Sequence, residues 1–479
     1  MRTISLLTLA ASLATPPSLA AQSPFRTNRN APMPVMTVAY DLCTGDVDGD
    51  GDVDLVIGND HDANQLFLND GRGGFVDATA GRLVTPATPA PGSGYANATY
   101  EVDLADADGD GDLDLFVVND HDVVDRLYLN DGLGFFTDVT ASATPTYPDY
   151  GVDQVVADFD GDGDVDWLIC NYFSLRLLLN NGAGVFTDAP AGSVPGNVFG
   201  DNRSFAADLD QDGDLDVVLG RGGFYASGNP LILVNQGNAV FALAPAATIP
   251  FPGLVHAADV DGDGKLDLLA NNGSQLLRNL GGLVFAPAVA LPSSTVASLD
   301  YDLDGDVDLI GNGKLLVNDG TGTFTQVTTG VTPNGDGACV ADLDGDGDPD
   351  VVDTGAGNTS ARFNFFNQVH TPTAPVHGQP WSIQLASPVR TTPVLWAPGV
   401  ANGAAPAPFA LPGLDGRLHL DPVSAIPLWP IFSTTGLDTI TWTIPNLPAL
   451  IGTELHYQAA VLDPLRPAFL TNATRDVIQ

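Results

Sequence analysis

The nine residues Asp46-Val47-Asp48-Gly49-Asp50-Gly51-Asp52-Val53-Asp54 decide the fold of this chain, because six later stretches repeat their pattern. Alternate aspartates on a short loop bring their carboxylates toward one point. This arrangement suits Ca²⁺, a hard cation that takes six to eight oxygen ligands. Glycine at the sixth position allows a left-handed backbone without steric cost. The seventh position ligates through its carbonyl oxygen, so Lys265 in the fifth copy leaves that site intact.

The seven copies, here named Asp loops 1 to 7 in chain order, all keep aspartate at their first, third, fifth and ninth positions. We predict up to seven Ca²⁺ ions, each held by the five odd positions of one loop. These residues are Asp46, Asp48, Asp50, Asp52 and Asp54; Asp106, Asp108, Asp110, Asp112 and Asp114; Asp158, Asp160, Asp162, Asp164 and Asp166; Asp208, Asp210, Asp212, Asp214 and Asp216; Asp259, Asp261, Asp263, Lys265 and Asp267; Asp300, Asp302, Asp304, Asp306 and Asp308; and Asp342, Asp344, Asp346, Asp348 and Asp350.

The residues that follow each loop exclude an EF-hand, which needs a bidentate glutamate at the twelfth position. Asp loop 1 has Ile57 there, and Asp loop 2 has Val117. Short apolar runs such as Leu55-Val56-Ile57 begin directly after the ninth position. Such runs, bounded by Gly and Asn, are typical of strands. Each Asp loop is therefore predicted to join two strands.

A second signal lies later in each repeat, where an apolar stretch ends in Asn and a glycine turn leads to Phe six residues on. Asn-Asp-Gly and Asn-Asn-Gly before an aromatic strand are typical of hairpins. Each repeat then holds four antiparallel strands, which is one propeller blade, and seven repeats predict seven blades. The seventh repeat lacks the Phe, so we expect residues around 23–30, with Phe25, to supply its fourth strand. The pairs are Asn69/Phe75, Asn130/Phe136, Asn180/Phe186, Asn235/Phe241, Asn279/Phe285 and Asn318/Phe324.

The Asp loop followed by a Leu-Val-type strand and an Asn-Asp-Gly…Phe turn resembles the FG-GAP/VCBS repeat family, known from the integrin α-subunit propeller and from many secreted bacterial proteins. The resemblance covers about residues 23–370. It implies a calcium-bearing seven-bladed propeller on an extracellular protein. It implies no particular ligand, because one scaffold of this kind serves many partners.

The net charge of the chain and its N-terminal segment limit the classes of partner and the cellular location that the sequence supports. The 59 acidic against 17 basic residues give a formal net charge of −42, which argues against nucleic acid and against electrostatic docking to an anionic membrane. Residues 1–20 have the pattern of a signal peptide, with Arg2, a short apolar core and a small-residue cleavage site. No later run is long enough for a transmembrane segment. The expectation is a secreted or cell-surface protein.

The remaining segments carry weaker patterns. We expect the propeller over residues 21–370 and a small β-sandwich over residues 371–479, where proline becomes frequent and short strand-like runs recur. Cys43 and Cys339 both stand three residues before an Asp loop, in repeats that are neighbours in a closed ring. They are either a disulfide that locks the ring or two small buried side chains.

Two sets of polar residues are candidates for ligand binding. Asp41, Glu101, Asp153 and Arg203 stand five residues before Asp loops 1 to 4, at the expected mouth of a central channel, where they could hold a sugar or a cation. The alternative is that they are ordinary ends of inner strands. The tetrad Asn-Asp-His-Asp occurs at 59–62 and 119–122, where it is either a transition-metal site or a trace of repeat duplication.

The sequence contains no His-Glu-x-x-His, Gly-x-Ser-x-Gly, phosphate-loop or dinucleotide motif. It therefore favours non-catalytic binding of an extracellular protein or glycan. Two alternatives remain open. One is a carbohydrate-active lyase or hydrolase working at the channel mouth of repeats 1 to 4, since paired carboxylates can serve as acid and base. The other is a structural protein of the cell envelope.

Overall fold

The computed structural model describes residues 39–364 with gaps at 60–61, 72, 85–97, 122, 146–147, 199, 201–202, 222–227, 245–248, 254–255, 303, 329–337, 345–346 and 356–357. It also describes strand β1 (Phe25–Arg26) and the backbone of the strands that follow Val369. The predicted signal peptide at 1–20 and Asp346 of Asp loop 7 lie outside this part of the chain.

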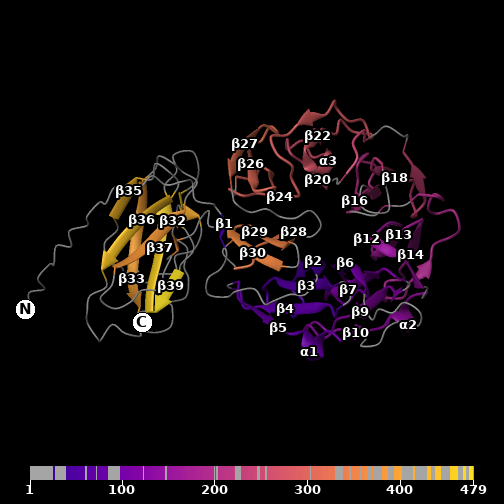
Figure 1. Cartoon of the computed structure of the whole chain (residues 1–479), viewed down its shortest axis with the longest axis horizontal. Helices are drawn as coiled ribbons and strands as arrows, with labels where there is room; N and C mark the ends of the chain where they lie inside the picture. The colour runs from indigo at the N-terminus through magenta and orange to yellow at the C-terminus, as the bar shows by residue number, and fades with distance from the viewer. Residues whose placement is uncertain are drawn as a thin grey trace, which may run out of the picture. The chain divides into compact units, whose positions relative to one another are not determined.

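Residues 39–328 form four-stranded antiparallel sheets set around a ring, as in an all-β propeller (Figure 1). In sheets 1 to 6 the order of the strands across the sheet is their order along the chain. Sheets 1 to 3 comprise β2 (Ala39–Gly45), β3 (Asp54–Asn59), β4 (Gln65–Asn69) and β5 (Phe75–Asp77); β6 (Thr99–Ala105), β7 (Asp114–Asn119), β9 (Arg126–Leu129) and β10 (Thr137–Asp138); and β12 (Gly151–Ala157), β13 (Asp166–Asn171), β14 (Ser174–Leu179) and β15 (Thr187–Asp188). Sheets 4 to 6 comprise β16 (Phe205–Ala207), β17 (Asp216–Leu219), β18 (Leu231–Asn235) and β19 (Phe241–Leu243); β20 (His256–Ala258), β21 (Asp267–Leu269), β22 (Gln275–Leu277) and β23 (Val289–Ala290); and β24 (Ala297–Leu299), β25 (Asp308–Gly311), β26 (Lys314–Asn318) and β27 (Phe324–Thr328).

A further four-stranded sheet, here called the terminal sheet, joins distant parts of the chain. It contains β28 (Ala338–Ala341), β29 (Asp350–Gly355) and β30 (Asn358–Asn364), and its fourth strand is β1. In the antiparallel register, Phe25 pairs with Asn364. The prediction that residues around 23–30 supply the fourth strand of the last repeat is confirmed for Phe25 and Arg26. The rest of that stretch lies outside the described residues.

The core lies between neighbouring sheets, because the second strand of each repeat is buried on both faces. All six residues of β3 are buried, and so are all six of β7 and of β13. Between sheets 2 and 3, Phe116 meets Trp167 edge to face with ring centroids 5.2 Å apart. Burial on both faces explains why these strands are continuous apolar runs rather than alternating ones.

The other elements are short. The helical segments α1 (Thr79–Arg82), α2 (Thr140–Ala143) and α3 (Ala270–Gly273) are four residues each, and a helix that could cross a membrane is absent from the described residues. Strands β8 (Val123–Val124) and β11 (Pro148–Asp149) pair between sheets 2 and 3.

The chain divides into two compact units, one of which is Phe25–Asn364. The other contains Phe365–Gln479 and carries two sheets. One sheet has the order β31-β32-β36, and the other has the order β34-β38-β37-β33-β35 with β39 also paired to β37. The strands are β31 (Val369–His370), β32 (Pro380–Ala386), β33 (Pro393–Ala401), β34 (Leu414–Asp415), β35 (Trp429–Phe432), β36 (Leu437–Thr443), β37 (Glu454–Val461), β38 (Ala468–Leu470) and β39 (Thr474–Val477).

The three cysteines are free thiols. Cys339 donates a hydrogen bond from Sγ to the carbonyl oxygen of Leu42, 3.3 Å away, and Cys43 is buried in the core between sheets 1 and 2. Of the two alternatives for Cys43 and Cys339, the structure has two unbridged small side chains, with Cys43 buried and Cys339 half-buried. Burial raises the pKa of both thiols, which disfavours the reactive thiolate.

Candidate functional site

The first residue of each Asp loop shapes the loop through the backbone. Asp46 accepts hydrogen bonds from the amide of Gly49 to Oδ1 (2.8 Å) and from the amide of Gly51 to Oδ2 (2.9 Å). The bond to the sixth-position glycine recurs in all seven loops. Gly51 has φ +95°, the left-handed conformation expected at this position.

The ninth residue connects the loop to the sheet. Asp54 is buried, and its Oδ1 accepts from the amide of Asn69 (2.8 Å) while its Oδ2 accepts from the amide of Val47 (3.0 Å). Burial raises the pKa of Asp54 to about 6, and the two amide bonds oppose the shift. The ninth residues of Asp loops 2 to 5 also have pKa values of about 6, and that of Asp loop 6 about 7, for the same reason: Asp114, Asp166, Asp216, Asp267 and Asp308.

The third residue of several loops has a buried oxygen without a hydrogen-bond partner. Oδ1 of Asp48, of Asp108 and of Asp261 is buried and accepts no hydrogen bond. A buried carboxylate oxygen without a partner is costly unless something else neutralises it. Carboxylate oxygens of three aspartates in a loop lie within 4.8 Å of one another, as in the sets Asp46/Asp48/Asp50, Asp106/Asp108/Asp114, Asp158/Asp160/Asp166, Asp208/Asp210/Asp216 and Asp259/Asp261/Asp263. These all-oxygen donor sets fit a hard cation.

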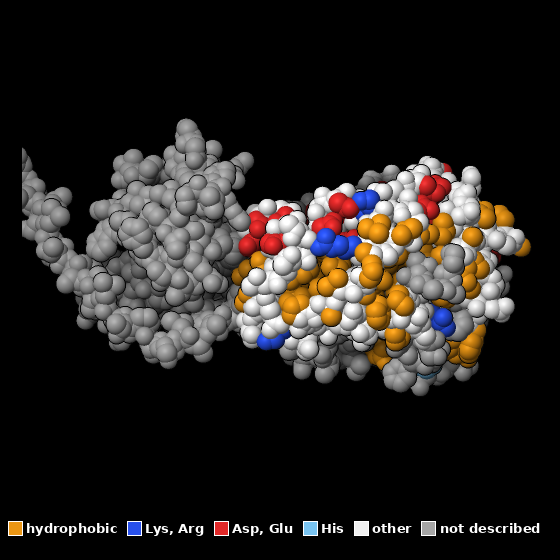
Figure 2. Space-filling view, turned by 90° about the horizontal axis from the view of Figure 1, so that it is seen from above, with side chains coloured by type: hydrophobic (Ala, Val, Ile, Leu, Met, Phe, Trp, Pro, Cys, Tyr) orange, Lys and Arg blue, Asp and Glu red, His pale blue; other side chains and the backbone are white. Residues whose placement is uncertain are grey.

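The Asp loops gather on one side of the ring. Figure 2 shows Asp and Glu side chains collected along one edge of the described surface, with Lys or Arg side chains next to them. Two arginines reach a third-position aspartate. Arg82 Nη1 lies 3.4 Å from Asp48 Oδ2 and donates to the carbonyl oxygen of Leu133 at 2.7 Å. Arg82 thus links Asp loop 1 to the last turn of sheet 2.

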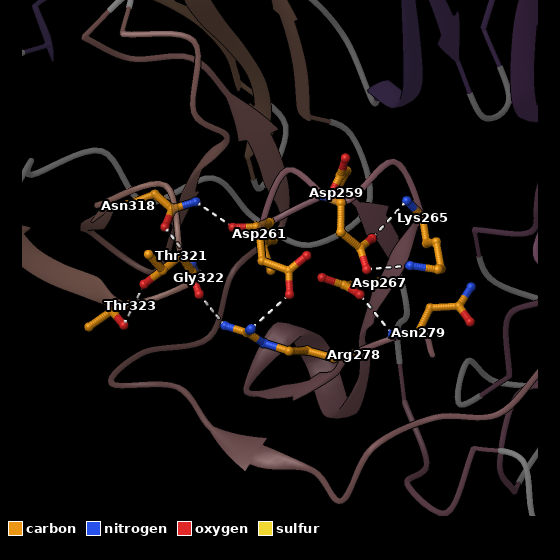
Figure 3. A network of polar contacts seen from close by, with 12 residues as sticks. Asp259, Asp261, Lys265, Asp267, Arg278, Asn279, Asn318, Thr321, Gly322 and Thr323 are labelled. Atoms are coloured by element: carbon orange, nitrogen blue, oxygen red, sulfur yellow. Dashed lines mark hydrogen bonds and ion pairs between the residues drawn. The ribbon is translucent and has the colours of Figure 1, made fainter. Parts of the chain in front are cut away.

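Asp loop 5 departs from the other loops, because two cations of the chain bind its predicted ligand residues (Figure 3). Arg278 Nη1 donates to Asp261 Oδ2 at 2.7 Å, and its Nη2 donates to the carbonyl oxygen of Thr321 in sheet 6. Lys265 Nζ donates to Asp263 Oδ2 and holds the pKa of Asp263 below its usual value. The sequence prediction assumed that the side chain of Lys265 does not affect the site. In the structure its ammonium group instead binds the fifth-position carboxylate of Asp263.

An asparagine side chain joins each of sheets 1 to 6 to the loop of the preceding sheet. Asn130 Nδ2 in sheet 2 donates to the carbonyl oxygen of Val47 in Asp loop 1 at 2.8 Å. The equivalent acceptors are second-position carbonyl oxygens, in the pairs Asn180 to Ala107, Asn235 to Phe159, Asn279 to Leu209 and Asn318 to Val260. In sheet 1, Asn69 Nδ2 donates to Leu343 of Asp loop 7 at 2.8 Å. Sequence reasoning placed these asparagines in hairpin turns and missed this role.

The candidate acids near the axis form a second set of bonds between sheets. Asp41 Oδ2 accepts from the amide of Val102 in sheet 2 (3.0 Å), and Glu101 Oε2 accepts from the amide of Gln154 in sheet 3 (2.5 Å). Asp153, 1% exposed, accepts from the amide and the hydroxyl of Ser204, the residue directly before β16 of sheet 4. Each acid therefore connects its own innermost strand to the next one around the ring.

Arg203 and two further residues complete this axial group. Arg203 Nη1 donates to the carbonyl oxygen of Val296 in the sixth repeat at 3.0 Å. Asp103, two residues after Glu101 and on the same face of β6, interacts electrostatically with Asp41, and His256 with Arg203. Sequence reasoning missed both, although the two-residue spacing from Glu101 was a signal for Asp103.

Burial shifts the pKa values of the axial group. The pKa of Asp41 rises to about 7, since burial outweighs its amide bonds and the attraction of Arg203. Burial, then the carboxylate of Asp153, raises the pKa of Glu101 well above its usual value. Burial and the guanidinium of Arg203 lower the pKa of His256 to about 3. The group is therefore one in which protons are shared and full ionisation is disfavoured.

The two Asn-Asp-His-Asp tetrads are described only in part. Asp60, His61 and Asp122 lie outside the described residues. In the second tetrad, Asp120 is fully buried, and its Oδ2 accepts a hydrogen bond from the hydroxyl of Tyr172 in sheet 3. Asp120 thus fixes the position of an aromatic side chain.

The comparisons with known proteins identify the repeat. A family model described as an FG-GAP-like repeat matches residues 46–117, 106–169, 158–219, 208–270 and 300–352, which together are more than half of the chain. No curated protein matches the chain. Among solved structures, the chain resembles an Agrocybe aegerita lectin in a study of its recognition of non-reducing terminal N-acetylglucosamine, with 21% identity, 61% of this chain and 81% of the lectin covered, and a TM-score of 0.43. It also resembles BBS1N in a complex with ARL6DN. The identity is 12%, the match covers 72% of this chain and 98% of BBS1N, and the TM-score is 0.46. Similarity at this level identifies no ligand.

Proposed function

The chain belongs to the family of FG-GAP-like repeat proteins, and from this premise we propose that it is a calcium-bearing extracellular protein that binds a glycan or a protein without catalysis.

Calcium is the proposed metal of the Asp loops. Support comes from the donor set, which is made of carboxylate oxygens, and from the buried, unpartnered Oδ1 atoms of Asp48, Asp108 and Asp261. Bound Ca²⁺ would offset the repulsion among the carboxylates of each loop. The proposed ligands are the odd-numbered positions of the seven loops, with the seventh contributing its carbonyl oxygen.

The proposed architecture is a seven-bladed propeller over residues 21–370, followed by a β-sandwich over residues 371–479. Counting the terminal sheet as the seventh blade is supported by the pairing of β1 with β30 and by the bond from Asn69 to Leu343. Two sheets in the second unit favour the sandwich. Residues 1–20 are the proposed signal peptide, and the mature protein is secreted or held at the cell surface, where calcium is plentiful.

The single observation that carries the non-catalytic role is the bonding of the axial acids. A general acid or base must reach the proton of a substrate. Asp41, Glu101 and Asp153 instead accept hydrogen bonds from backbone amides of the neighbouring sheet. With Arg203, they remain the proposed polar contacts for a ligand that enters along the axis.

The test is a glycan array and a panel of purified extracellular matrix proteins, probed with the chain from residue 21 onward in millimolar Ca²⁺, followed by a product assay on every ligand retained. Retention without product supports the proposal. Release of a shortened or unsaturated saccharide would replace binding by catalysis, and retention of nothing on either surface would overturn the binding role.

A further inference from the structure

An aromatic pocket of about 500 Å³ lies on sheet 3. Its lining includes Tyr150, Asn171, Tyr172, Phe173, Arg176 and Asp188. The turn between β13 and β14 forms it, at the opposite end of β13 from Asp loop 3. The volume and the mixture of aromatic with a few polar groups are those of small-ligand sites.

Tyr172 and Phe173 are unusual residues for a two-residue hairpin turn. Asn171 pairs with Ser174, so the hairpin turn consists of Tyr172 and Phe173 alone. In sheet 6 the same turn is Asn312-Gly313, with φ +44° and +72°, which is the turn chemistry expected there. Phe173 is 78% exposed, and a bulky apolar side chain gains nothing from that position in the free protein.

Asn171 has a buried side-chain oxygen without a partner. It is 7% exposed, lines the pocket, and its Oδ1 accepts no hydrogen bond. In sheet 2 the equivalent Asn119 Oδ1 accepts from the hydroxyl of Thr99, at 3.1 Å. Gly151 replaces this threonine opposite Asn171 and offers no donor.

Asn59 of sheet 1, opposite Ala39, also has an unpartnered Oδ1. Asn171 differs in that it is one of the residues that line the aromatic pocket. A buried acceptor beside aromatic rings calls for a ligand that brings a donor.

The pocket is held in shape by contacts that span sheets 2 and 3. Tyr150 and Tyr172 stack with ring centroids 5.4 Å apart and planes inclined by 24°. The buried Asp120 accepts the hydroxyl hydrogen bond of Tyr172, and the amide of Tyr172 donates to the carbonyl oxygen of Tyr150. Just before Tyr150, β11 pairs with β8 of the neighbouring repeat. The rings are thus oriented before any ligand arrives, which lowers the entropic cost of binding.

From these observations we infer that the pocket binds a neutral saccharide. A pyranose ring presents C–H groups to an aromatic face, which carries partial negative charge, and hydroxyl donors at its edge. The ring would lie against Phe173 and Tyr172, with a hydroxyl group donating to Asn171 Oδ1. The ion pair of Arg176 Nε with Asp188 Oδ1 (2.9 Å) adds polar atoms at the rim. The formal net charge of −42 disfavours anionic sugars. This inference rests on the proposed binding function and names a ligand class for it, at a site other than the axial group.

The test compares the native chain with the variants Phe173→Ala and Asn171→Ala on an array of neutral oligosaccharides, in Ca²⁺, with affinities measured by calorimetry for each saccharide retained. Loss of one aromatic face or of one buried hydrogen bond should weaken binding about tenfold. Phe135→Ala is the matched control, since Phe135 is an exposed phenylalanine (45%) in the last turn of sheet 2. Thermal melting of each variant shows whether it is folded.

Binding that is lost in Phe173→Ala and Asn171→Ala but kept in Phe135→Ala supports the inference. Saccharide binding that survives both pocket substitutions overturns the pocket while leaving the proposed function in place. Retention of proteins but of no neutral saccharide overturns the inference and leaves the proposed function standing. Retention of neither class overturns both.

Discussion

Asn69 Nδ2 donates a hydrogen bond to the carbonyl oxygen of Leu343, 2.8 Å away, across 274 positions of the chain. The same asparagine donates to the carbonyl oxygen of Val53 in its own loop at 2.9 Å. The equivalent asparagines of sheets 2 to 6 each bond the Asp loop of the sheet before them. The bond from Asn69 is therefore the member of this series that joins the first repeat to the last.

Replacing Asn69 by Ala should destabilise the protein by about 1–3 kcal/mol, because it leaves buried carbonyl oxygens without a donor. Asn235→Ala is the matched variant, because Asn235 of sheet 4 makes the equivalent bond to the carbonyl oxygen of Phe159 in Asp loop 3. A closed ring predicts similar losses for the two variants in denaturant unfolding. A much smaller loss for Asn69→Ala would mean that the first and last repeats are open to water at their junction.

The chain's own cations should make Asp loop 5 the loop that depends least on calcium. Arg278 and Lys265 already neutralise Asp261 and Asp263, whereas such cations are absent from the bonds described for Asp loop 2. We expect Asp108→Asn to remove about one calcium ion per chain and Asp261→Asn to remove none at limiting calcium. Equilibrium dialysis with metal analysis measures this difference. Equal losses in the two variants would show that Arg278 and Lys265 do not compete with the metal.

The axial group predicts a pH dependence of stability. The folded state raises the pKa of Asp41 from an ordinary value of 3.8 to about 7, so it binds this proton more tightly than the unfolded chain does. The contribution of Asp41 to stability is then fully present below pH 4 and is lost as the pH rises to about 7. Asp41→Asn, which imitates the protonated group and can still accept from Val102, should be more stable than the native chain at pH 8. Its advantage should shrink toward pH 5.

The comparison of the native chain with Asp41→Asn isolates this group from the ninth-position aspartates, whose pKa values near 6 to 7 contribute equally to both proteins. The measured difference in stability also includes any change in the pKa values of the neighbouring Glu101 and Asp103, because the charge of Asp41 raises both. The exposed Asp62 provides the control variant, Asp62→Asn. A constant stability difference between pH 5 and pH 8, measured in saturating calcium, would contradict the assigned shift of Asp41.

The sequence predicted local features of the fold because they depend on spacing alone. The glycine at the sixth loop position, the strand after Asp54 and the last strand supplied by Phe25–Arg26 all follow from the repeat pattern. Contacts between repeats depend on how far side chains reach across a packed ring. For this reason the bond from Asn130 to Val47 and the bridge from Arg278 to Asp261 could not be predicted from the repeat pattern.

The candidate ligand residues show the same limit. The common spacing of Asp41, Glu101 and Asp153 was visible in the sequence, but their amide acceptor role required the register of neighbouring inner strands. The aromatic pocket was missed although a signal existed. Tyr172 and Phe173 stand in a turn where another repeat has Asn312-Gly313, and a comparison of turns between repeats would have found them.

We propose that calcium ions bound by the Asp loops hold the sheets in their ring. The most direct measurement is the calcium content of the purified chain together with its melting temperature before and after a chelator. We predict several bound calcium ions per chain and a large fall in melting temperature on their removal, because each site at a tenfold excess of metal adds about 1.4 kcal/mol. A chain that carries no calcium and melts at the same temperature with and without the chelator would contradict the account.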